Sequence, residues 1–519
     1  MARAKPELEN DSLEGIDLKR WGLSLEAVHS LGRQLFDCWD RFHDCFTTRT
    51  RDTSPLAHVY LKGLLLLPDE RNYANIARRF IAPTDDGQAL QQFMSDSPWP
   101  AQRVFAQIQR EISHDPGLRG GILLLDESGD KRSGELSAGA GRQYLGRLGK
   151  VDVGQVGVAL SYALDDFWAL VDAELFLPEN WFDADHADLH RRLHIPEGLV
   201  FATKPQIGLG LVRRAHSSGL PFEAVAADAV YGRDSAFRAG LDKDKIPYIA
   251  DIPSDYPVYV ERPEVGVPPR KSDRGPAPSN CQVLNGVESV RASSLVNEKT
   301  VWETLQLREG ERGTVEVTAW SRRVWTISDA WQVREEWLVV YRQSDGKMRY
   351  SLSNAPADAP LKVMMQWRGQ RYFVERTFQD EKSELGWDEL VAQKYRAWMH
   401  HAALAALALY FVMTVRRQWA KKYPRSEELK EEYGVPKLPT LSVANIRALL
   451  ASVMPLRQFS PEQAIRVVIG HLQNRAGSTG SRCRKQKRER QGNAGRPPGA
   501  AHGPSGTPRH RRCEKATSR

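Results

Sequence analysis

The stretch Ile122-Leu123-Leu124-Leu125-Asp126 decides the fold class, because it is a short, continuous apolar run that ends in a carboxylate. A second run of this kind, Ala224-Val225-Ala226-Ala227, ends in Asp228. Strands that are apolar at every position are buried on both faces, as in a sheet with helices on both sides. Ligands bind such sheets beyond the carboxyl ends of the strands. The sequence therefore predicts an α/β fold in which Asp126 and Asp228 share one cleft, although aspartate also ends strands simply as a turn residue.

The segment between these two runs predicts a hairpin followed by a helix. Val151–Leu164 and Phe167–Leu177 are β-favouring runs joined at Asp165-Asp166. Pro205–Ser217 shows the apolar spacing of a helix. Residues 116–250 are therefore expected to form the first part of the α/β core.

The flanking regions have different patterns. Residues 1–115 predict a helical N-terminal region, because apolar residues recur at helical spacing in Leu25–Asp40, Pro55–Leu67 and Ala101–Ile112. Residues 251–364 begin with many prolines and continue with β-favouring runs, which predicts a β-rich insertion. A helical stretch from about Trp367 to Trp419 lies in a further core segment, residues 365–420, and residues 421–474 are expected to be mostly helical.

The basic excess of the chain lies in its C-terminal tail. The 519 residues carry a net charge of +8, from 73 Lys and Arg against 65 Asp and Glu. Residues 475–519 hold 13 Lys and Arg and two acids, so the tail is +11 and residues 1–474 are −3. Its Gly, Pro and Ser content and its few large apolar residues predict disorder. The tail could add affinity for a polyanion such as DNA, or it could have no specific role.

Neither a membrane span nor a disulfide framework is predicted. The longest apolar run, Ala402–Val415, has 14 residues, whereas a span needs about 20, so a buried core helix is expected. The five cysteines form no CxxC pair, and the N-terminus has no signal-peptide pattern. These features favour a cytoplasmic protein with free thiols.

A third candidate for chemistry is the helix that begins near Arg371. Arg371 and Glu375 are one turn apart, and Lys382 lies two turns beyond Glu375, so the three side chains share a face. A carboxylate between two cations suits phosphate chemistry. A solvent-exposed ladder of salt bridges would produce the same pattern.

The order of these elements, and the motifs themselves, resemble a known family. A strand with Asp, a hairpin, a helix, a second strand with Asp, a β-rich insertion and a helix with Glu is the plan of the ribonuclease H-like DDE transposases. The chain resembles bacterial insertion-sequence transposases of the DDE superfamily endonuclease group over about residues 40–420. The motifs that carry this resemblance are Leu125-Asp126-Glu127-Ser128-Gly129, Ala227-Asp228-Ala229-Val230-Tyr231-Gly232, and Arg371, Glu375 and Lys382 at their characteristic spacing. Where the related signature has a Tyr before the Arg, this chain has Arg368.

The resemblance implies a catalytic site made by Asp126, Asp228 and Glu375, which would also be the metal ligands. Carboxylates that lie close together repel, and hard divalent cations with oxygen ligands relieve this repulsion. Two Mg²⁺ ions are implied, for which Mn²⁺ can substitute, with Asp126 bridging both. Arg371 and Lys382 would bind DNA phosphate.

The implied partners are double-stranded DNA at the transposon ends and in the target, bound by a dimer. Recognition of the ends is expected in the helical N-terminal region. The implied function is cleavage of the element ends followed by strand transfer. Two alternatives stay open: a ribonuclease H-like nuclease without strand transfer, and a DNA-binding derivative that has lost catalysis. The presence of all three carboxylates disfavours the second alternative.

Two further clusters are expected to be structural. Three histidines recur at helical spacing and could imitate a zinc site, but a solvated helix explains them better: His186, His190 and His194. Five tryptophans gather in the β-rich insertion, where packing is the expected role: Trp302, Trp320, Trp325, Trp331 and Trp337. Related transposases use an aromatic residue from such an insertion to stack a flipped base.

Overall fold

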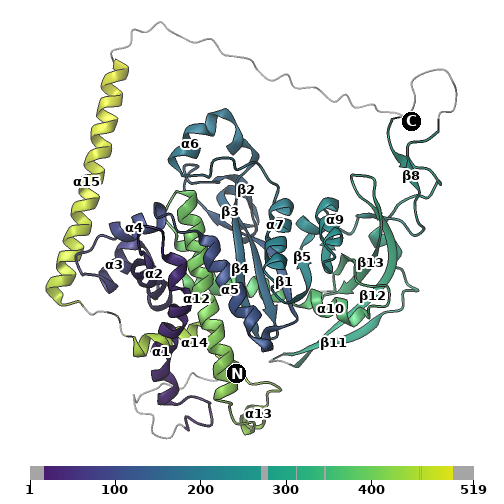
Figure 1. Ribbon diagram of the computed structural model, residues 1–519, viewed down its shortest axis with the longest axis horizontal. Coiled ribbons are helices and arrows are strands. Elements are labelled where there is room, and N and C mark those ends of the chain that lie inside the picture. The colour runs from purple at the N-terminus through teal and green to yellow at the C-terminus, as the bar shows by residue number, and fades with distance from the viewer. Residues whose placement is uncertain are drawn as a thin grey trace. The chain divides into compact units, whose positions relative to one another are not determined.

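The computed structural model describes residues 17–269, 279–310, 313–343, 346–454, 456 and 459–494. The chain divides into two compact units, one that ends at Arg457 and one that begins at Gln458. The first unit is built around a large mixed sheet with helices packed on it (Figure 1). The described part of the second unit is the helix α15 (Pro461–Ala494).

A ten-stranded sheet forms the core of the first unit. Its centre is β1 (Gly121–Lys131), which pairs in parallel with β5 (Phe222–Ala227) and antiparallel with β3 (Lys150–Leu164). On the far side of β5 lies the parallel strand β6 (Tyr248–Ile252). β3 also pairs with β2 and β4, which are Gly141–Leu145 and Phe167–Phe176. The predicted hairpin of β3 and β4 is confirmed, with Asp165 in the left-handed region at its turn.

The β-rich insertion continues this sheet and is not a separate layer. The last of its long strands, β14, pairs antiparallel with β6 of the core. The four long strands are β11 (Glu303–Gly310), β12 (Gly313–Ile327), β13 (Val333–Arg342) and β14 (Met348–Ser353). The β-favouring runs Val315–Trp320 and Val324–Ile327 belong to the one strand β12, which pairs with β13 from Thr318 to Ile327 across the polar residues between the runs.

Helices cover both faces of the central strands. Leu125 of β1 pairs with Leu160 of β3, and the position of Gly208 on α7 (Lys204–Ser217) lies against Leu125. Gly157, three residues from Leu160, lies against the ring of Trp398 on α12 (Tyr395–Lys422). Alternate residues of a strand point to opposite faces, so α7 and α12 lie on opposite sides of the sheet. The continuous burial of β3 and β4 follows from this double cover.

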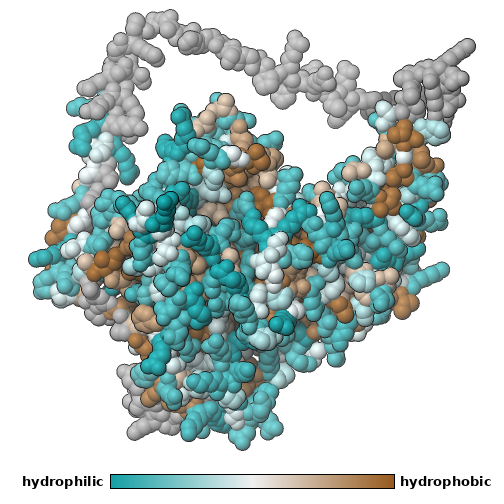
Figure 2. Space-filling view, viewed as in Figure 1, coloured by the Kyte–Doolittle hydropathy of each residue, from teal (hydrophilic) through white to brown (hydrophobic). Residues whose placement is uncertain are grey.

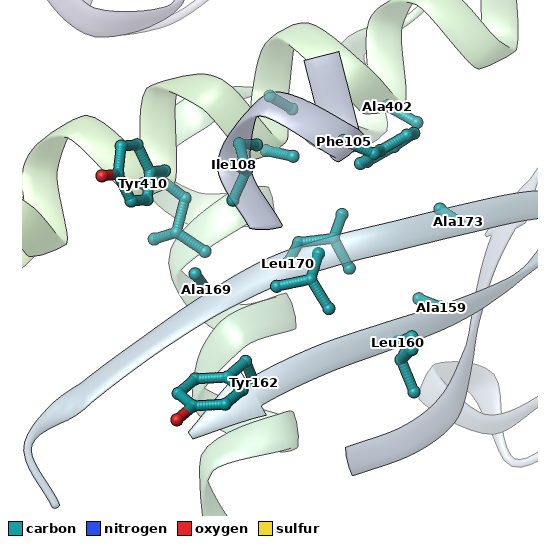
Figure 3. Packing of buried hydrophobic residues seen from close by; sticks show 14 of the residues in the cluster. Phe105, Ile108, Ala159, Leu160, Tyr162, Ala169, Leu170, Ala173, Ala402 and Tyr410 are labelled. Carbon is teal, nitrogen blue, oxygen red and sulfur yellow. The ribbon is translucent and has the colours of Figure 1, made fainter. Parts of the chain in front are cut away.

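The central apolar helix α12 is part of the protein core. Together with α5 (Ala101–His114) it packs on β4, and Phe105 and Ile108 of α5 lie in the same buried cluster as Leu170 of β4 (Figure 3). α12 is long and apolar enough to cross a membrane. However, 94% of its apolar 18-residue stretch is buried inside the protein. The prediction of a buried core helix is therefore confirmed. The surface turned to the viewer in Figure 2 is correspondingly mostly hydrophilic.

Three helices replace the single helical stretch predicted from Trp367 to Trp419. They are α10 (Leu361–Gly369), α11 (Tyr372–Leu385) and α12. α11 ends at Gly386, whose φ of 70° lies in the left-handed region that glycine adopts without strain. The side chain of Arg71 fills the space where a Cβ of residue 386 would be.

The N-terminal helices share the core of the sheet. Buried residues of the first five helices belong to the same hydrophobic cluster as β1, β3, β4 and α12. These helices are α1 (Leu25–Phe42), α2 (Ser54–Leu66), α3 (Tyr73–Phe80), α4 (Gln88–Ser95) and α5. The remaining helices of the unit are α6 (Ala187–Arg192), α8 (Ala229–Gly232), α9 (Ser235–Lys243), α13 (Glu428–Tyr433) and α14 (Val443–Val453).

The C-terminal region differs from the expected division at residue 474. α15 begins after Ser460, whose side chain and backbone form a reciprocal cap with Gln463, and it continues to Ala494. Residues 475–494, predicted to be disordered, are therefore helical. Arg, Lys, Gln and Glu make up most of residues 482–491, and all four are good helix formers. The prediction of disorder, which rested on the Gly, Pro and Ser content of the whole tail, did not take this local helix propensity into account. The rest of the predicted tail, residues 495–519, lies outside the described residues.

Candidate active site at the carboxyl edge of the sheet

Three aspartates occupy one row across three parallel strands. Leu125 of β1 pairs with Ala227 of β5, and Ala227 pairs with Ala250 of β6. The next residue of each segment is acidic: Asp126, Asp228 and Asp251. The row lies where the β1–β5 pairing ends, as predicted for Asp126 and Asp228. β1 itself continues to Lys131, because its pairing with β3 continues.

Successive side chains of β1 point to opposite faces of the sheet, and that of Asp126 points to the face covered by α11 and α12. Asp126 follows Leu125, which faces α7, and it pairs with Ala159, two residues from Gly157 on the α12 face. Its Oδ1 accepts a hydrogen bond from the Glu127 backbone N–H at 2.7 Å. Burial raises the pKa of Asp126 to about 6, Arg371 opposes this shift, and the negative charge of Asp228 adds to it. Asp126 and Asp228 therefore interact electrostatically.

Asp228 and Gly232 explain the second motif. The Asp228 side chain accepts a hydrogen bond from the Val230 backbone N–H at 2.9 Å and so caps the short helix α8. At Gly232, a Cβ would lie 1.9 Å from the backbone oxygen of Asp251. Only glycine allows α8 to approach the end of β6 this closely, so the motif fixes the acidic row.

Glu375 lies in the first turn of α11, as predicted, and is exposed. It lines a cavity of about 720 Å³ together with Asp126, Gly129, Phe378 and Lys382. The side chain of Glu375 makes no hydrogen bond or ion pair with any residue that the structure describes. Its carboxylate is therefore available to a ligand in the cavity that Asp126 also faces.

The two predicted phosphate-binding cations both pair with acids of the sheet. Arg371 donates from Nη2 to Asp126 Oδ2 at 3.3 Å and from Nη1 to Asp251 Oδ2 at 2.9 Å. Lys382 donates to Asp130 Oδ1 of β1 at 2.7 Å. α11 is thus attached to the sheet at both ends, and the alternative of a solvent-exposed ladder is wrong.

Asp251 and Arg368 are site residues that the sequence pattern did not identify. Arg368 forms a bidentate pair with Asp251, through Nε at 3.2 Å and Nη2 at 2.9 Å. Burial favours a higher pKa for Asp251, but Arg368 and Arg371 outweigh it and hold this pKa below its ordinary value. The sequence does contain a pattern that indicates Asp251, because Ile249-Ala250-Asp251 is again an apolar run that ends in Asp. The departure from Tyr at position 368 is explained by this pair.

The donor set fits a hard divalent cation. Asp126, Asp228 and Glu375 offer carboxylate oxygens, and the raised pKa of Asp126 reflects a buried negative charge that a cation would stabilise. As the side chains stand, no three acidic, His or Cys residues in the described ranges are grouped closely enough to hold an ion. Asp126 interacts with Asp228 and shares its cavity with Glu375, and the metal-binding triad of these three residues stays a prediction.

The tryptophan cluster has the packing role expected of it, with one exception, whereas the three histidines do not lie on one solvated helix. His186 and His190 lie against the ring of Trp181, and α6 is too short to carry all three histidines. Of the five tryptophans in the insertion, Trp331 is exposed, with 40% of its surface accessible and a positive φ of 56° in the β12–β13 turn. The other four are partly buried in the insertion.

Comparison with known proteins connects this site to one family. The family model described as DDE superfamily endonuclease matches residues 41–314, just over half of the chain. That range contains Asp126 and Asp228 and ends before Glu375. A protein of Microchaete diplosiphon, described as a probable transposase for insertion sequence element IS701, is 27% identical over 316 residues, which cover 61% of this chain and 71% of that protein. The chain belongs to the DDE superfamily endonuclease family.

Proposed function

We propose that this protein is an insertion-sequence transposase that cleaves DNA at the element ends and joins them to target DNA. The observation that carries the proposal is the meeting of Asp126 and Asp228 in one row of the sheet, with Glu375 on the wall of the cavity that Asp126 faces. Membership of the DDE superfamily endonuclease family and the similarity to a probable IS701 transposase support it.

Asp126, Asp228 and Glu375 would hold divalent cations, two Mg²⁺ ions by resemblance. Such ions activate an attacking oxygen and stabilise a leaving oxygen in phosphoryl transfer. In the proposed reaction, water attacks the phosphate at the element end and frees a 3′-hydroxyl group. That hydroxyl then attacks a phosphate of the target strand, and the bond from this phosphate to the 3′-oxygen of the target strand breaks.

The cations of α11 would orient the DNA backbone. Lys382 lines the cavity and pairs with Asp130, and Arg371 pairs with Asp251 and with Asp126 of the cavity wall. Binding of DNA would give each cation a phosphate as a new or shared partner, and Arg suits bidentate recognition of phosphate. The proposed partners are transposon-end and target duplexes, bound by a dimer with the N-terminal helical region contacting the ends.

A strand-transfer assay separates this proposal from its rivals. The substrate is a pre-cleaved duplex with a free 3′-OH at the inverted repeat that flanks the gene, incubated with Mg²⁺ and a supercoiled target plasmid. A joined product is expected from wild-type protein and not from Glu375→Gln. Glu179→Gln, at an exposed acid outside the cavity, is the matched control and should join normally. Cleavage of intact ends without joining would indicate a nuclease, and binding with neither reaction would indicate a non-catalytic derivative.

A further inference from the structure

We infer that Asp251 is a positioning residue that binds Arg368 and shares Arg371 with Asp126, and so limits how strongly Arg371 competes with divalent cations for the catalytic carboxylates. This inference rests on the proposed function of Asp126, Asp228 and Glu375. It assigns a role to the third aspartate of the row, which the family motifs quoted above do not include.

The hydrogen bonds of Asp251 show that it serves as an anchor for cations and is not a further metal ligand. Oδ1 accepts from Arg368 Nε at 3.2 Å and from Ser351 Oγ at 2.7 Å. Oδ2 accepts from Arg368 Nη2 and from Arg371 Nη1, both at 2.9 Å. A carboxylate has about four acceptor positions, so those of Asp251 are all used. Each oxygen of Asp126, in contrast, accepts one hydrogen bond from the described residues.

Arg371 is shared between two acids, and the contact with Asp251 is the shorter. Its guanidinium lies 2.9 Å from Asp251 and 3.3 Å from Asp126, and about 15% of the Arg371 side chain is exposed. The negative charges of Asp251, Asp126 and Asp228, in this order, raise the pKa of Arg371 against the effect of burial. Without the charge of Asp251, Arg371 would pair fully with Asp126 and compete with a metal ion for its oxygens.

Asp251 also connects the sheet to the start of α11. Arg371 is the residue before the first turn of α11, and Glu375 lies in that turn. Arg368 is held on a second side by the ring of Tyr341, 4.9 Å from its guanidinium. The pairs with Arg368 and Arg371 therefore connect the end of β6 to the helix that presents Glu375. A partner of this kind tunes metal affinity through the residues that it positions.

The test is a titration of the DNA-free protein with Mn²⁺, followed by electron paramagnetic resonance of the free ion. Asp251→Asn is expected to weaken Mn²⁺ binding about tenfold or more, in line with other residues that position metal ligands. The double variant Asp251→Asn with Arg371→Gln is expected to regain most of this affinity, because the competing cation is gone. A purely structural role for Asp251 predicts no recovery.

Two further variants keep the inference falsifiable. Ser351→Ala removes one donor but leaves the carboxylate of Asp251, and it should bind Mn²⁺ as the wild type does. If Asp251→Asn does not fold, the single variant Arg371→Gln tests the inference. It is expected to bind Mn²⁺ more tightly than the wild type, because the competing cation is absent. Unchanged Mn²⁺ affinity in Asp251→Asn, no recovery in the double variant, or no gain in Arg371→Gln would each overturn the inference.

Asp126→Asn separates this inference from the proposed function. If Asp126→Asn binds Mn²⁺ like the wild type, the ion does not bind at this site and both proposals fail. If Asp126→Asn loses binding while Asp251→Asn keeps it, only the role of Asp251 is refuted.

Discussion

The charged form of the Asp126 side chain would bind a metal ion, but it is unfavourable in the folded, metal-free protein. Its folded-state pKa of about 6 lies above the ordinary value of 3.8, so the folded protein holds a proton that the unfolded chain releases. Between about pH 4 and pH 6 the folded state binds more protons, and stability therefore falls as pH rises through this window. Above it, the charged carboxylate is a cost to the metal-free protein.

Asp126→Asn should therefore stabilise the metal-free protein at neutral pH while abolishing DNA cleavage. The gain at pH 7.5 is expected to be roughly 1–2 kcal/mol, because two pKa units correspond to about 2.7 kcal/mol and the side chain remains 20% exposed. Thermal melting at pH 7.5 and at pH 4 measures it, and the difference between the two proteins should largely vanish at pH 4. A less stable Asp126→Asn protein at pH 7.5 would contradict the assigned pKa shift.

At the level of single residues, the sequence identified the acids with local signals. Asp126 and Asp228 follow apolar runs, and Glu375 has Arg and Lys at fixed spacing. Asp251 was missed because the predicted boundary between the core and the insertion, after residue 250, falls inside its strand β6. Only the pairing of β6 with β5 and β14 shows that it lies inside the sheet.

Among the elements, the contact between α8 and β6 makes Gly232 sensitive to substitution. Gly232→Ala is expected to lower the free energy of unfolding by about 1–3 kcal/mol, because the new Cβ meets the carbonyl of Asp251. DNA cleavage should fall further than stability explains, since Asp228 and Asp251 move together. Urea unfolding and a cleavage assay measure both. Gly210→Ala in α7, where a Cβ meets nothing within 4 Å, is the control and should not destabilise.

A buried ion pair joins the insertion to the core. Arg238 of α9 and Glu336 of β13 are 0% and 1% exposed at their side chains and lie 3.0 Å apart. Glu336→Gln leaves Arg238 buried without its charge partner, so a loss of about 3 kcal/mol in unfolding free energy is expected. Glu335→Gln, at the half-exposed neighbouring acid, should change stability by less than about 1 kcal/mol. Equal urea midpoints for the two variants would exclude a role of this pair in stability.

The elements that the sequence predicted best are those specified locally. The β3–β4 hairpin, α7 and α5 lie within a few residues of their predicted bounds. Periodicity could not reveal that β14 extends the core sheet, because that pairing joins segments about a hundred residues apart. The breaks at residues 370 and 386 were missed because the apolar pattern continues through them.

For the whole molecule, the charge distribution predicts a role for the C-terminal arm, residues 475–519. The arm carries +11, part of it on the helix α15, while residues 1–474 carry −3. Deleting residues 475–519 is expected to reduce the slope of log K against log salt for DNA binding by several units, at about 0.9 for each phosphate that the arm neutralises. Fluorescence anisotropy across a salt series measures the slope. An unchanged slope would show that the arm does not bind DNA.

The central claim is that Asp126, Asp228 and Glu375 form one metal-dependent site that cleaves DNA. The most direct measurement is cleavage of a supercoiled plasmid carrying the inverted repeats that flank the gene, with Mg²⁺, by wild-type protein and by Asp126→Asn, Asp228→Asn and Glu375→Gln. The account predicts Mg²⁺-dependent cleavage at the element ends by the wild type, and a loss of at least about a thousandfold in each folded variant. Cleavage at the wild-type rate by any one of the three variants would contradict it.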